Sequence, residues 1–150
     1  MNMPHAGLMD ESALGPVEGP LQRAKLHIRG GRRRLKQGKI SAGIVTLYDA
    51  LGAAMKWYAG SPGRKGGLNI SEDDDITDEK KLFEILKRSG VIDNSFDYEA
   101  FDSLVERALH NEMPGYDYSG VLKGIESIMT QLGVMPFDEK ELPPEDPSTF

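Results

Sequence analysis

The sequence predicts an all-α protein, a single helical bundle of about five helices. Three observations support this fold class. Apolar residues recur at three- and four-residue steps, which is the spacing of one helix face. Glycine, proline and capping residues interrupt these stretches at short intervals. No segment shows sustained polar–apolar alternation between turn signals, as a half-buried strand would.

Residues 21–37 form the first predicted helix, because Pro20 suits the first turn of a helix. Gly30 and Gly31 lie inside it, and a glycine weakens a helix interior by about 1 kcal/mol relative to alanine. The pair therefore predicts either a kink or a close contact with another helix.

Residues 40–58 form the predicted central helix, because only Asp49 and Lys56 carry charge in this stretch. A row of large apolar residues lies beside a row of small ones; the first is Ile40, Ile44, Leu47, Leu51, Met55 and Tyr58, and the second is Gly43, Ala50 and Ala54. The small row suits the close approach of a second helix. We expect a homodimer that forms through this small-residue face.

Start and stop signals define the other helices. After a Gly- and Pro-rich loop at 59–70, acids at 72–75 and 78–79 lie at the start of a helix that runs to Ser89 and is closed by Gly90.

Two further helices complete the predicted bundle. Ser95 caps the first of them, and Pro114 stops it. The second is capped by Asp117 or Ser119 and ends at Gly133.

The two ends of the chain differ from this core in composition. Residues 1–20 contain three prolines and three glycines, and they predict a disordered leader. Residues 136–150 contain four prolines and five acids, and they form an acidic, Pro-rich tail. The helical bundle domain is then 21–135.

Charge is sorted along the chain. Residues 21–66 contain eleven Lys/Arg and one acid, a net charge of +10, whereas residues 67–150 have a net charge of −13. Either the two segments neutralise each other in the fold, or the basic segment binds an external anion.

Several classes of protein are excluded or disfavoured. The chain has no cysteine, which excludes disulfides, thiolate metal sites and Cys nucleophiles. No apolar run approaches the roughly 20 residues that span a bilayer, and from the composition of residues 1–16 we expect no export signal. We expect a cytoplasmic protein with no membrane association, no metal site and no cofactor.

Basic residues on the first helix are the main candidate binding site. They predict an anion-binding face that could follow an RNA backbone, although a face neutralised by the acidic half of the molecule has the same pattern; the residues are Arg29, Arg32, Arg33, Lys36 and Lys39. A buried Asp49 would be costly without a partner, so we expect a structural ion pair with an arginine of the first helix.

Four short stretches, in this order, resemble the HEPN family of small helical bundles: 50–56 (ALGAAMK), 86–93 (LKRSGVID), 106–112 (ERALHNE) and 116–118 (YDY). The resemblance implies a dimeric bundle and, in many members, an RNA-cleaving toxin or a nucleotide-binding partner of a nucleotidyltransferase. The family's active motif places four to six residues between an arginine and a histidine, whereas two separate Arg107 from His110 here.

The sequence therefore predicts a non-catalytic, HEPN-like interaction protein that binds a protein or an anionic partner. The main alternative is a HEPN-type ribonuclease that uses Arg107 and His110 as catalytic residues. The other is an RNA-binding module that uses the basic helix at 29–39. A structural role for His110 at the end of its helix is the simpler interpretation.

Overall fold

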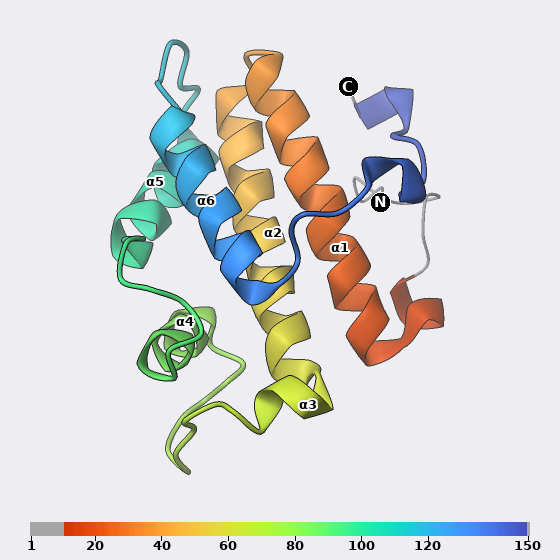
Figure 1. Cartoon of the computed structure of the whole chain (residues 1–150). Coiled ribbons are helices and arrows are strands. Elements are labelled where there is room, and N and C mark those ends of the chain that lie inside the picture. The colour runs from red at the N-terminus through yellow and green to blue at the C-terminus, as the bar shows by residue number, and fades with distance from the viewer. Residues whose placement is uncertain (1–10, 150) are drawn as a thin grey trace.

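A computed structural model describes residues 11–149 and shows an all-helical bundle, which confirms the predicted fold class (Figure 1). No strand occurs in this range. The helices are α1 (Glu11–Lys36), α2 (Ile40–Gly60), α3 (Pro62–Lys65), α4 (Glu79–Arg88), α5 (Tyr98–His110) and α6 (Ser119–Leu132), followed by the short 3-10 helices η1 (Glu139–Glu141) and η2 (Pro147–Thr149). None of the helices described is both long and apolar enough to cross a membrane.

Helix α2 is the centre of the bundle, as its sequence predicts. It packs against α1, α3, α4, α5 and α6 (Figure 1). Ile44, Leu47 and Met55 are fully buried. Apolar residues therefore lie nearly all round this helix because other helices cover it on several sides.

Two glycines allow α1 and α2 to approach closely. A Cβ atom on Gly31 would lie 2.8 Å from Leu47 Cδ2, and one on Gly43 would lie 2.7 Å from Leu35 Cδ2. Of the two predicted outcomes for the Gly30–Gly31 pair, the structure shows the close contact.

The small-residue face of α2 is already covered within the chain. Ala50 and Ala54 have no exposed surface, and Gly43 is buried against Leu35 of α1. The prediction of a homodimer through this face is therefore wrong about the surface, because the face packs inside the molecule. Dimerisation itself stays a prediction.

Helix α1 begins earlier than expected. It starts at Glu11, so the prediction of a disordered leader is wrong for residues 11–20; residues 1–10 lie outside the described part of the chain. Gly15 has φ 86° and ψ 178°, which kinks the helix ahead of Pro16. Val17 and Leu21 pack against the core, and this packing offsets the poor helix propensity of the segment.

Local details of three other segments differ from the prediction. The loop at 59–70 contains the short helix α3, which has Pro62 in its first turn. The cap of α5 is Asp97 and not Ser95, because Ser95 hydrogen-bonds to Asp93 instead. At α6 the N-cap position is Tyr118, and Asp117 accepts hydrogen bonds from the Ser119 amide and hydroxyl.

The acidic tail crosses α1 and packs on it. Figure 1 shows the chain after α6 running across α1 to the far side of that helix. Leu142 is 8% exposed, and Lys25 lies 5.8 Å from the centre of the Phe137 ring. The tail is therefore part of the folded body.

Candidate functional site

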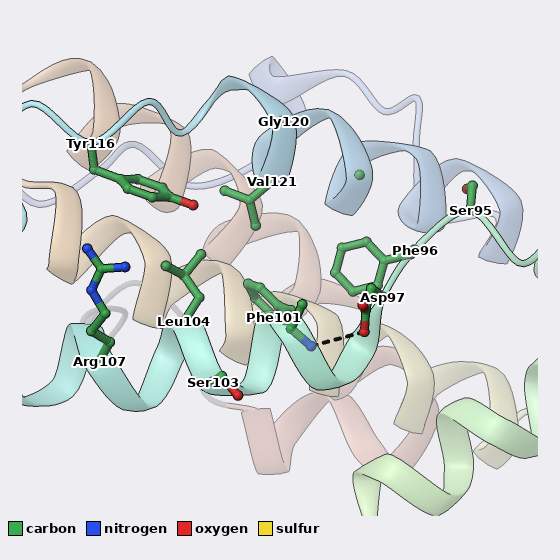
Figure 2. Close-up of a pocket in the computed structure, with 12 residues that line it drawn as sticks. Ser95, Phe96, Asp97, Phe101, Ser103, Leu104, Arg107, Tyr116, Gly120 and Val121 are labelled. Atoms are coloured by element: carbon green, nitrogen blue, oxygen red, sulfur yellow. Dashed lines mark hydrogen bonds between the residues drawn. The ribbon is translucent and has the colours of Figure 1, made fainter.

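A groove lies between α5 and α6. Its volume is about 450 Å³, and both helices pack on α2 (Figure 2). Leu104 of α5 and Val121 of α6 line it and are partly exposed. Phe96 and Phe101 add aromatic surface and are mostly buried.

The local sequence explains the shape of this groove. Asp97 accepts a hydrogen bond from the Ala100 amide at 3.0 Å, which fixes the start of α5. Gly124 on α6 makes room for the Phe96 ring, because a Cβ atom there would lie 2.8 Å from Phe96 Cδ1. Gly120, one turn before Gly124, also lines the groove and presents only backbone to it.

The two ends of the groove have opposite charges. Arg107 lies at one end, with its guanidinium carbon 5.9 Å from the centre of the Tyr116 ring. Asp97 lies at the other end (Figure 2). The protein surface around a groove reduces the screening of charges by solvent. These two charges therefore favour a ligand that is negative at the Arg107 end and positive at the Asp97 end.

The two candidate catalytic residues have different neighbours. Arg107 lines the groove, whereas His110 Nε2 lies 3.0 Å from Glu106 Oε1, and both side chains of that pair are about 70% exposed. His110 is not among the residues that line the groove. The arrangement fits a solvent-exposed i,i+4 pair at the end of α5.

The predicted anion-binding residues of α1 are largely paired within the chain. Arg29 and Arg33 both contact Glu145 of the tail. Arg32 Nε lies 3.3 Å from Glu126 of α6. Lys36 and Lys39 are exposed. Internal neutralisation therefore accounts for three of the five predicted residues, and the structure brings these three into contact with acids that the sequence could not assign to them.

Asp49 lies in a different environment from the one expected. It is partly exposed and lines a cavity of about 170 Å³ with Arg23, Lys56 and Glu79. Within residues 11–149 no ion pair joins Asp49 to an arginine, so the predicted ion pair is wrong there. The physical reason is that this side of α2 is not fully covered, and water can solvate the carboxylate.

A tyrosine pair at the contact of α2 with α5 could not be predicted from the sequence. Tyr48 and Tyr98 hydrogen-bond to each other, and both line a cavity of about 310 Å³ with Glu79. Burial raises the pKa of Tyr98, and the hydrogen bond with Tyr48 raises it further. No sequence motif links the two residues, because their positions are 50 apart.

In residues 11–149 no group of three or more His, Asp or Glu side chains is arranged to hold a metal ion. Comparison with family models, curated proteins and solved structures finds no match for this chain. The HEPN resemblance is therefore a hypothesis that rests on four short sequence stretches.

Proposed function

We propose that this chain is a non-catalytic interaction protein that binds a helical segment of a partner protein in the α5–α6 groove. The observation that supports this most is the groove itself, which combines a partly exposed apolar lining with opposite charges at its ends. Interaction sites commonly have this composition, with apolar anchors at the centre and charged groups at the rim.

The charges favour one kind of occupant. The α5 wall from Asp97 to Arg107 is roughly 15 Å long at 1.5 Å per residue, which matches about three helical turns. A helix has partial positive charge at its N-terminus and partial negative charge at its C-terminus. A partner helix with its C-terminal end at Arg107 and its N-terminal end at Asp97 would place each partial charge beside a side chain of opposite charge.

The proposed binding site does not include His110, which is held by Glu106 and does not line the groove. Arg107 is the one of the two candidate catalytic residues that can contact a ligand bound there.

Selection from displayed peptides tests the groove. From a library of helical peptides, those that bind the wild-type protein are kept, and those that also bind the Leu104→Asp variant are removed. This substitution places a charge on the groove lining. We expect enriched peptides to carry apolar residues at i, i+4 and i+7 and an acid beyond the last anchor. Leu104→Asp should lower the affinity for a selected peptide at least about tenfold, since peptide binding would bury an unpaired charge.

A matched control lies on the same helix. Leu109 is 58% exposed and does not line the groove, so Leu109→Asp should leave peptide affinity unchanged. Arg107→Gln should lower the affinity for peptides that carry the acid more than the affinity for the same peptides with glutamine in place of that acid. Equal effects of Leu104→Asp and Leu109→Asp would contradict the proposed site.

The alternative of a HEPN-type ribonuclease rests on Arg107 and His110, which are three positions apart in the last turn of α5. His110→Ala would abolish RNA cleavage without changing the melting temperature if this alternative holds. Absence of cleavage by the wild-type protein would reject it.

A further inference from the structure

An acidic segment of the tail binds two arginines of α1. Arg29 Nη2 donates a hydrogen bond to the Pro143 carbonyl at 2.7 Å, and its Nε lies 3.5 Å from Glu145 Oε1. Arg33 pairs with the other oxygen of the same carboxylate. The two arginine side chains are only 11% and 15% exposed, so the carboxylate closes a largely buried site.

Two further features make this contact resemble a bound peptide. Leu142 is 8% exposed and anchors the segment beside the charged pair. Two prolines follow it, and proline restricts the backbone of the segment. An apolar anchor, a stiff backbone and one charged group are the elements by which extended peptides are recognised.

The fit of the segment is incomplete. Arg29 Nε is buried and has no hydrogen-bond partner in the described part of the chain, although it lies near Glu145. Burial lowers the pKa of Arg34, the charge of Arg33 lowers it further, and Glu145 partly offsets both. Glu145 thus lies at ion-pair distance from Arg29 Nε without forming a hydrogen bond to it, and an acceptor placed closer to this nitrogen would bind it better.

We propose that this face of α1 is a binding site for an acidic, proline-containing segment of another protein, and that the chain's own tail occupies it in the free state. The partner would carry a leucine followed by prolines and a glutamate, the chemistry that the site binds here. A tethered segment acts at an effective concentration in the millimolar range, so it strongly reduces the apparent affinity of any external peptide. Weakening the tail should therefore expose the site.

Fluorescence anisotropy with a labelled synthetic peptide of residues 136–150 tests this on the full chain. The proteins are the wild type and Glu145→Gln. Glu145→Gln removes the charge of the tethered segment and keeps its size, so we expect it to bind the peptide at least about tenfold more tightly than the wild type. The same peptide with Glu145→Gln should bind the variant at least about tenfold more weakly than the unmodified peptide.

The matched control is Glu141→Gln, which removes an exposed acid of the tail for which residues 11–149 provide no ion pair. It should leave the peptide affinity at the wild-type value. Adding Arg33→Gln to the Glu145→Gln protein should reduce peptide binding, while circular dichroism confirms that the helical fold is kept.

Three outcomes would overturn the proposal: equal binding by the wild type and Glu145→Gln, equal binding of both peptides, or no effect of Arg33→Gln. Tighter binding of a single- or double-stranded oligonucleotide than of the peptide would also overturn it, since the site would then recognise phosphate groups.

Discussion

At the residue scale, Asp74 shows how one carboxylate fixes a loop. Its Oδ2 accepts hydrogen bonds from the Ser71 amide at 2.8 Å and the Ser71 hydroxyl at 3.0 Å, and it pairs with Arg88 of α4. Arg88 also donates to the Asn69 carbonyl. The hydrogen bonds from Ser71 and Arg88 lower the pKa of Asp74 from 3.8 to about 2.

This pKa shift predicts a pH dependence. The lowered folded-state value means that the ionised carboxylate stabilises the fold above pH 3.8, and that this contribution is lost as the pH falls towards 2. Asp74→Asn should therefore lower the urea midpoint at pH 7, and the difference from the wild type should shrink below about pH 4. Asp73→Asn is the control, because the described residues offer the Asp73 carboxylate no hydrogen bond or ion pair. A difference that stays constant from pH 7 to pH 2 would contradict the assignment.

Individual site residues were predicted unevenly. The sequence identifies Arg29 and Arg33 as members of a basic face, but their partner is more than 110 positions away and depends on the path of the tail. Asp49 was expected to be buried because its helix is apolar, yet its own side of α2 faces a cavity. Local pattern defines residue type and spacing, whereas partners depend on tertiary packing.

At the element scale, the sequence predicts the ends of a helix best where a capping residue or a glycine marks them. Gly133 ends α6 with φ 91°, as predicted. Asp78, one of the acids expected at the start of α4, caps it by accepting hydrogen bonds from two backbone amides. The start of α1 was missed because its stability comes from core packing and not from propensity. The groove could not be predicted, because the amphipathic patterns of α5 and α6 do not determine the distance between the two helices.

The close contact of α1 with α2 predicts the effect of adding one methyl group. A Cβ atom on Gly43 would lie 2.7 Å from Leu35 Cγ and 3.1 Å from the Leu35 backbone nitrogen, which cannot move aside. Gly43→Ala should destabilise the protein by about 1–3 kcal/mol despite its better helix propensity. Urea denaturation measures the change.

Gly30→Ala is the matched control for this prediction. A Cβ atom there would lie 3.0 Å from Arg34 Nη1, the end of a flexible side chain. The gain in helix propensity should then keep stability within about 1 kcal/mol of the wild type or raise it. Equal losses for both alanine variants would show that the helices do not approach as closely as described.

At the scale of the whole molecule, contacts between the basic and acidic segments recur. Arg29, Arg32 and Arg33 of α1 pair with Glu126 and Glu145, and Lys56 of α2 lies 3.8 Å from Glu79 of α4. The basic segment and the acidic segment of the sequence therefore lie against each other in the fold.

Screening by salt should weaken this attraction. Raising NaCl from about 0.05 M to about 1 M should lower the free energy of unfolding in urea by about 1–2 kcal/mol, given the modest energy of each partly exposed pair. The double variant Arg33→Gln/Glu145→Gln should show a smaller loss, because it lacks the pairs of Glu145 with both Arg29 and Arg33. A wild-type stability that rises or stays constant over this range would show that these pairs contribute little.

The central position of α2 also determines how the outer helices can move. Because α4, α5 and α6 each rest on α2 more than on one another, a change in the spacing of α5 and α6 should leave the α1–α2 pair in register. Widening of the groove to admit a bulky ligand would disturb the packing of α6 on Phe96 and its ion pair with Arg32 of α1. Amides of α2 should exchange with deuterium only when the entire protein unfolds, whereas those of α6 should also exchange through smaller openings.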